Sequence, residues 1–142
     1  MTIADDVKTV MKANAALMAV LTGDVWTGIT EVNRQTAAAA FDSNGEIKPC
    51  ALVKVGTEVP SGPYSRSVRV AIMIYFYQRT GYSSIESAMD KTYDLLHEKK
   101  IGTGTFLILH DHTLHGYEVV QREPNALDAA MSMQRYYQTR LR

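Results

Sequence analysis

The sequence lacks most of the residue patterns that would point to a particular chemistry. Cys50 is its only cysteine, which excludes an internal disulfide and a zinc site built from several cysteines. This residue lies in the apolar run CALVKV and is expected to be a small core residue. No GxSxG, Walker, GxGxxG or CxxC pattern occurs. We therefore do not expect an enzyme.

Net charge and long apolar runs are also missing. Fifteen basic and fifteen acidic side chains cancel at neutral pH, so no overall field draws the protein to nucleic acid or to an anionic membrane. The longest apolar candidate, AIMIYF, is far shorter than the ~20 residues of a membrane helix, and the first twenty residues are too polar for a secretory signal. With 46% hydrophobic residues over 142 positions, we expect one soluble cytoplasmic domain that spans residues 1–142 and has no membrane partner.

Two segments have the periodicity of amphipathic helices. Thr2 begins a capping box, and the apolar residues that follow recur at steps of three, four and seven up to Gly23. This pattern predicts one helix of about five turns. Ser83 begins a second capping box, whose apolar stripe predicts a helix that ends near residues 98–100.

The strongest strand signal is SVRVAIMIYFYQ, residues 67–78, which is β-branched or aromatic at almost every position. Both of its faces are apolar at the centre, which is typical of a central strand or of a face that another subunit buries. CALVKV predicts a short strand before it, and residues 56–66 predict a long exposed loop. Between residues 26 and 47 we expect a short strand, a helical turn and a tight turn at Asn44–Gly45.

The C-terminal third predicts two more strands, TFLIL and GYEVV, joined in a hairpin by HDHTLH. Residues 126–142 fit either a helix or a strand, and periodicity does not decide between them. The elements together predict an α+β fold, with a mainly antiparallel sheet of about four to five strands packed against two helices.

The stretch LHDHTLHGYE holds the best candidates for a metal site. His110 and His112 would lie on the same side of a strand, and His115 could add a third ligand. The HExxH spacing of helical zinc sites is absent, and hairpin turns collect polar residues without any metal, so we expect no metal and no cofactor. A pH-sensitive subunit contact is another reading of these histidines. The basic tail with Arg135, Arg140 and Arg142 could meet phosphates or an acidic neighbour, although a solvated chain end is favoured.

The order of these elements resembles the tail terminator, or tail-completion, family of long-tailed bacteriophages. The phrases that carry the resemblance are IKPCALVKVG, RSVRVAIMIYFYQ and GYSSIESAMDKTYDLLHEKK, and the likeness runs from about residue 5 to residue 120. It implies an α+β domain that assembles into rings of about six subunits. Family members often close with a strand, which favours the strand reading of residues 131–140.

The function that this resemblance implies is mechanical. A homo-hexameric ring would cap the tail tube, stop its polymerisation and dock the head-tail connector, while DNA passes through the lumen without sequence-specific binding. Such a protein would belong to the tail or neck of the virion and would assemble in the host cytoplasm. The alternatives are a head-completion or neck connector protein, a small metal-dependent enzyme that uses the HDHTLH hairpin, and a regulatory domain that binds peptides along a sheet edge.

The ring would need subunit and partner contacts, for which the sequence offers two groups of candidates. The first group is on one face of the long strand: Arg69, Tyr75 and Tyr77. The second group belongs to the loop 56–66, which is long enough to reach a neighbour or the tube: Glu58, Tyr64 and Arg66.

Overall fold

A computed structural model describes most of the backbone of the chain. The described residues are 3–29, 32, 35–60, 67–79, 83–101, 108–110, 119–123 and 129–141. Within these ranges, side chains are described except at 57–60, 67–68, 110, 119–123, 129–132 and 139–141.

Six strands form one mainly antiparallel sheet, which confirms the predicted α+β fold class and adds a strand to the expected number. The strand order is β1-β2-β3-β6-β4, and β5 also pairs with β6. Only the short pairing of β1 with β2 is parallel among these strands. The strands are β1 (Val25–Trp26), β2 (Cys50–Pro60), β3 (Ser67–Gln78), β4 (Ile108–His110), β5 (Val119–Glu123) and β6 (Ala129–Leu141).

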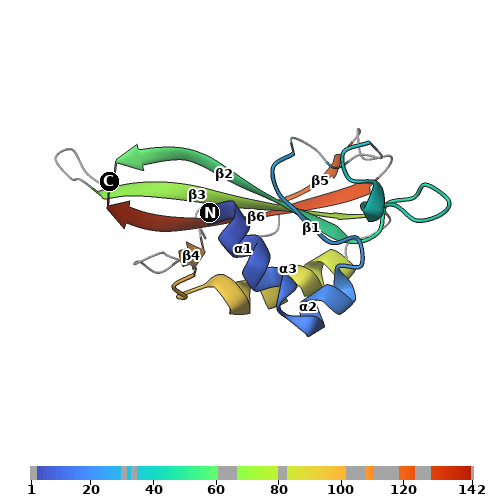
Figure 1. Cartoon of the computed structure of the whole chain (residues 1–142), viewed down its shortest axis with the longest axis horizontal. Helices are drawn as coiled ribbons and strands as arrows, with labels where there is room; N and C mark the ends of the chain where they lie inside the picture. Colours follow the sequence, from blue (N-terminus) through green and yellow to red (C-terminus); the bar gives the residue numbers. More distant parts are fainter. Residues whose placement is uncertain are drawn as a thin grey trace.

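Three helices lie together on one side of the sheet: α1 (Ile3–Lys12), α2 (Ala15–Val20) and α3 (Ser83–Leu96) (Figure 1). The expectation of a single N-terminal helix was wrong. Asn14 has an extended backbone, and its Oδ1 accepts a hydrogen bond of 2.8 Å from the N–H of Leu17, so it ends one helical run and caps the next. No helix in the described ranges is long and apolar enough to cross a membrane.

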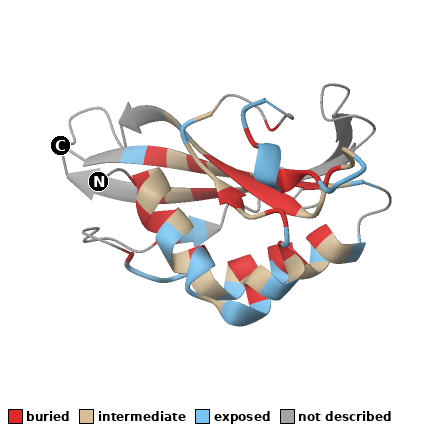
Figure 2. Cartoon of the chain, turned by 45° about the vertical axis from the view of Figure 1, so that its right-hand side comes forward, coloured by how far each residue is buried: buried red, intermediate tan, exposed pale blue. Residues whose placement is uncertain are grey.

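The main core fills the space between the helices and the sheet (Figure 2). Alternate residues of β3 face it, as the period of two predicts, because successive side chains of a strand point to opposite faces. The fully or almost fully buried residues of β3 on this side are Val70, Ile72, Ile74 and Phe76. From α3, the predicted stripe packs against them, with Ile85, Met89, Thr92 and Leu96 buried.

A smaller core lies on the opposite face of the sheet, at one end only. The segment 26–47, with the 3-10 helix η1 (Ala38–Ala40), packs there on Cys50, Leu52 and Tyr77. The predicted helical turn is thus a 3-10 helix. The tight turn at Asn44–Gly45 is also confirmed, since Gly45 has φ +76° and its N–H donates to the carbonyl of Asp42.

Strand β2 is longer than the sequence suggested. It pairs with β3 as far as Pro60, with a register shift between Val55 and Glu58. Residues 56–60 therefore belong to a strand and not to the expected loop, because a bulge lets the pairing continue past Gly56. Residues 61–66 of that expected loop lie outside the described part of the chain.

The predicted C-terminal hairpin was wrong, whereas the strand reading of the last segment is confirmed. In the described residues β4 and β5 pair with β6 and not with each other. They follow one another along the same edge of β6, because β3 occupies its other edge over twelve paired positions. The long pairing with β3 holds residues 129–141 as a strand.

Candidate subunit interface on the open face of the sheet

The smaller core covers one end of the sheet surface that faces away from the helices, and the described side chains beyond it form a second surface. We call this surface the open face. Its residues come from three adjacent strands and are all partly or largely exposed to solvent. They are Lys54, Gly56, Arg69, Ala71, Met73, Tyr75, Met133, Arg135 and Tyr137.

Strand register gives the open face three spaced cations. Lys54 and Arg135 are both paired with Met73, one on each side, so their Cα atoms are ~10 Å apart across the strands. Arg69 lies four residues before Met73 on the same side of β3, which corresponds to ~14 Å along the strand. The three residues are therefore anchored at separate points of the face, while the Arg69 and Arg135 head groups both contact the Tyr137 side chain.

Two tyrosine rings hold these cations against the sheet. The Lys54 ammonium lies 5.4 Å from the centre of the Tyr75 ring, and the Arg69 guanidinium lies 4.5 Å from the centre of the Tyr137 ring. Arg135 also donates a hydrogen bond of 3.4 Å to the Tyr137 hydroxyl. Each cation–π contact contributes about 0.5–1 kcal/mol at an exposed site, and together they restrict the long basic side chains. The face is thus an ordered basic and aromatic surface.

The chain does not neutralise this charge within its described part. The open face as defined contains no aspartate or glutamate, and no ion pair in the described ranges involves Lys54, Arg69 or Arg135. The Nε atom of Arg135 is buried and has no hydrogen-bond partner there. Because its exposed cations have no acidic partner in the described part, the face is suited to a partner that carries acidic or carbonyl oxygens.

The residues singled out from the sequence fall into three groups. Arg69 and Tyr75 lie on the open face, as the alternation of β3 predicts. Tyr77 is only 4% exposed and packs in the smaller core. Other residues of the same chain therefore already cover its ring. Glu58 lies in β2 with its side chain outside the described set, and Tyr64 and Arg66 lie outside the described residues.

Sequence reasoning missed Lys54 on this face, whereas it named Arg135 as a residue that could meet an acidic neighbour. It did not place Lys54, Arg135 or Tyr137 beside Arg69 and Tyr75. The sequence placed Arg135 in a basic tail, whereas the structure pairs it with the middle of β3. The strand reading of residues 131–138 already puts Arg135 and Tyr137 on one side. What no local pattern reveals is the register that sets Lys54 and Arg135 on either side of Met73.

The histidine cluster is not tested by the structure. His110 ends β4, but its side chain and the residues His112 and His115 lie outside the described set. Among the side chains that are described, no three histidine, cysteine or carboxylate groups converge in a way that could hold a metal ion.

Cys50 has the environment of a core residue. It is fully buried, and this burial raises the pKa of its thiol from 9.0 to about 12, although the nearby Lys48 charge acts in the opposite direction. A thiol with such a pKa is not ionised at neutral pH and is a poor nucleophile.

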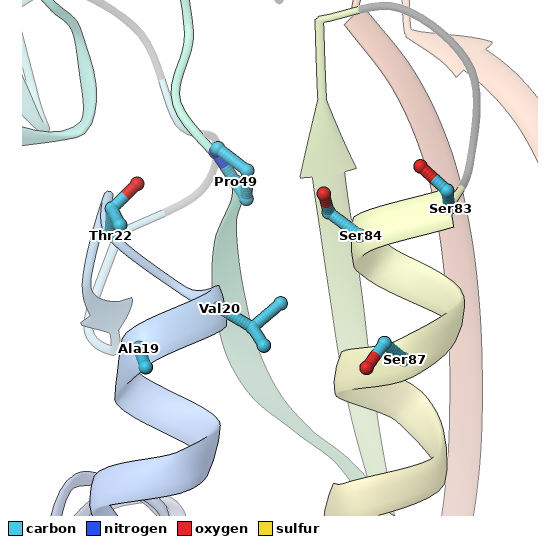
Figure 3. Close-up of a pocket in the computed structure, with 7 residues that line it drawn as sticks. All are labelled: Ala19, Val20, Thr22, Pro49, Ser83, Ser84 and Ser87. Atoms are coloured by element: carbon cyan, nitrogen blue, oxygen red, sulfur yellow. The ribbon is translucent and has the colours of Figure 1, made fainter.

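A shallow groove of about 490 Å³ lies between the end of α2 and the start of α3 (Figure 3). It is lined by Ala19, Val20, Thr22, Pro49, Ser83, Ser84 and Ser87. None of these seven residues can act as a general base, which a serine needs to become a nucleophile. The backbone N–H groups of Ser84 and Ile85 already donate to the side chain of Gln78. Among the described residues that line it, the groove therefore has no pair of nucleophile and general base.

The fold is similar to that of a chain in the virion of a native gene transfer agent (GTA) particle. The two chains share 14% sequence identity and superpose with a TM-score of 0.63 over 96% of this chain and 92% of the other. No protein-family model and no curated protein matches the sequence. The chain thus shares the whole of its fold with a virion component.

Proposed function

We propose that the protein is a structural virion protein of the tail-terminator type, which forms a ring of about six subunits at the end of a phage tail tube. The observation that carries the proposal is the likeness to a chain of a gene transfer agent virion, because it covers 96% of this chain and 92% of the other. A match over both whole chains concerns the complete domain and not a common substructure. The sequence resemblance to tail terminators supports the same class independently of the coordinates.

The two-layer architecture supplies what a ring requires. A closed ring of identical subunits needs two different contact surfaces on each subunit. One is the open face, with its three cations, and the other lies on the helix side of the sheet. A ring that binds the last layer of the tube would block further addition, and its second rim would receive the head-tail connector. DNA would pass through the lumen without base-specific contacts.

We propose that the protein acts by binding and not by catalysis. The Cys50 thiol is buried with a raised pKa, and the serine groove has no base among its lining residues. Binding to copies of itself, to the tube protein and to the connector is the activity that we propose, within the tail or neck of the virion.

Light scattering tests the proposal directly. The purified protein is measured alone and after mixing with tail-tube protein, and tube lengths are measured by electron microscopy with and without it. We expect a ring of about six chains of 15.8 kDa, free or bound to tube ends, together with shorter tubes. A monomer that ignores tubes would exclude the terminator role. A ring that binds portal or connector assemblies but not tubes would identify a neck protein instead.

A further inference from the structure

The solvent side of α3 carries a straight row of acidic residues. Glu86, Asp90 and Asp94 follow one another at steps of four, and all three are exposed. Residues four apart lie on the same side of a helix, and eight steps along the axis span ~12 Å. We call these three residues the acidic row. It points away from the sheet, because the opposite stripe of α3 is buried in the main core.

Within the described residues, the acidic row has no ion pair with a cation of its own chain. The nearest basic residue in α3, Lys91, donates a hydrogen bond of 3.2 Å to the Ser87 hydroxyl. Like charges at steps of four destabilise an isolated helix, so the row has an energetic cost until cations approach it.

The acidic row matches the open face in charge, number and size. Three carboxylates extend over ~12 Å of helix, and three cations extend over ~10 Å across the strands and ~14 Å along β3. A helix that lies across this part of the sheet could therefore bring its carboxylates near these cations. Both surfaces also belong to rigid elements and not to loops.

We propose that the acidic row of one subunit docks on the open face of the next copy of the same chain. This inference rests on the proposed ring and identifies the two surfaces that close it. The acidic row lies on the helix layer and the open face lies on the other side of the sheet (Figure 1). Because the two surfaces of a subunit point in opposite directions, two subunits related by a two-fold axis could not bury all four surfaces at once. Each subunit would instead bind the next one head to tail, and the chain of contacts would end when a ring closes.

Charge reversal of the two surfaces tests the contact. The sheet variant carries Lys54→Glu, Arg69→Glu and Arg135→Glu, and the helix variant carries Glu86→Lys, Asp90→Lys and Asp94→Lys. We expect each variant alone to fall from the ring mass to a single chain of 15.8 kDa in light scattering. An equimolar mixture should regain the ring mass, because alternating variants place opposite charges at every junction and a ring of about six subunits is even. This rescue also shows that both variants fold.

A matched control carries Lys8→Glu, Lys99→Glu and Lys100→Glu. It makes the same change in net charge as the sheet variant but places none of it on the open face, so it should keep the ring. Addition of salt should dissociate the wild-type ring, since exposed ion pairs are screened.

The other outcomes separate the inference from the proposed function. A wild-type ring whose charge-reversed variants still form rings alone, or whose folded variants stay monomeric when mixed, would overturn the contact and leave the ring intact. A sheet variant that forms rings but no longer binds tubes would overturn it too, because the open face would then serve the tube protein. Absence of wild-type rings both in solution and on tubes would overturn the proposed function itself.

Discussion

Gln78, the last residue of β3, caps the first turn of α3 through its side chain: its Oε1 accepts a hydrogen bond of 2.9 Å from the N–H of Ser84. A second bond of 3.1 Å comes from the N–H of Ile85. The first N–H groups of a helix have no partner within the helix, so this contact satisfies two of them and ties the helix to the central strand. It links the layer that carries the acidic row to the strand at the centre of the open face.

Replacement of Gln78 by alanine should lower the free energy of unfolding by about 1 kcal/mol, the typical cost of a lost helix cap. Gln78→Glu is the matched control, since it keeps an acceptor oxygen and adds a negative charge that the helix N-terminus favours. Urea denaturation of the three proteins measures the difference. Equal midpoints for wild type and Gln78→Ala would show that the cap contributes nothing to stability.

Gly23 should not tolerate a side chain. A Cβ at this position would lie 2.8 Å from the Cβ of Cys50 and 3.0 Å from the carbonyl oxygen of Pro49. Gly23→Ala forces the start of β2 away from the turn after α2, and we expect a loss of about 1–3 kcal/mol. The exposed neighbour Thr22 provides the control, because Thr22→Ala should change stability by less than about 0.5 kcal/mol. Thermal unfolding compares the two, and similar losses would refute the packing argument.

Stability should fall in alkaline solution. Burial raises the pKa of Cys50 from 9.0 to about 12 and also raises the pKa of Tyr136 above its usual value. Both groups ionise first in the unfolded chain. The contribution of Cys50 is complete below pH 9 and is lost as the pH rises toward 12, and that of Tyr136 is complete below pH 10 and falls at higher pH. Each group contributes at most about 1.4 kcal/mol per pH unit.

Urea unfolding at several pH values between 8 and 11 measures this slope. Cys50→Ala removes the thiol and should make the slope shallower above pH 9, whatever its effect on stability at pH 8. An unchanged slope in this variant would mean that the thiol ionises equally easily in both states.

The proposed subunit contact can be tested at Tyr75. Tyr75→Ala removes the ring that lies 5.4 Å below the Lys54 ammonium, and we expect it to weaken subunit association by about tenfold, as loss of an aromatic interface anchor does. Tyr75→Phe keeps the ring face and should retain the wild-type assembly. Sedimentation velocity over a range of concentrations compares the variants, with circular dichroism as a check on folding. If Tyr75→Ala sediments like the wild type, this residue is not part of the subunit contact.

The fold was predictable where one segment determines its own structure. β3 begins and ends at the predicted residues because β-branched and aromatic side chains follow one another through it. β6 was ambiguous, since its methionines, glutamines and alanines suit either structure, and only pairing with β3 decides. The helix break at Asn14 was not predicted, because an asparagine can equally be a polar residue on the exposed face of a helix or the cap of a new helix.

The candidate site was predictable only in part for a related reason. Alternation places Arg69 and Tyr75 on one face of β3. Lys54 reaches that face through the register of the neighbouring strand β2, and Arg135 through the pairing of β3 with the distant strand β6, and no local pattern encodes either register. The spacing of Glu86, Asp90 and Asp94 can be read from the sequence. Their proposed role in a subunit contact also requires that this side of α3 is exposed and that a basic surface is available to bind it.

The edges of the sheet limit how copies of this chain can add to one another. Past its short pairing with β1, strand β2 is interrupted by the register shift between Val55 and Glu58 and ends at Pro60, which has no N–H to donate. On the other side, β6 is bordered by two short strands in succession, β4 and β5. Bulges, prolines and short border strands are poor templates for a further strand. Unlimited addition of strands, as in amyloid-like fibres, is therefore disfavoured. The same sheet edges would keep free copies of the protein from polymerising with one another through strand pairing.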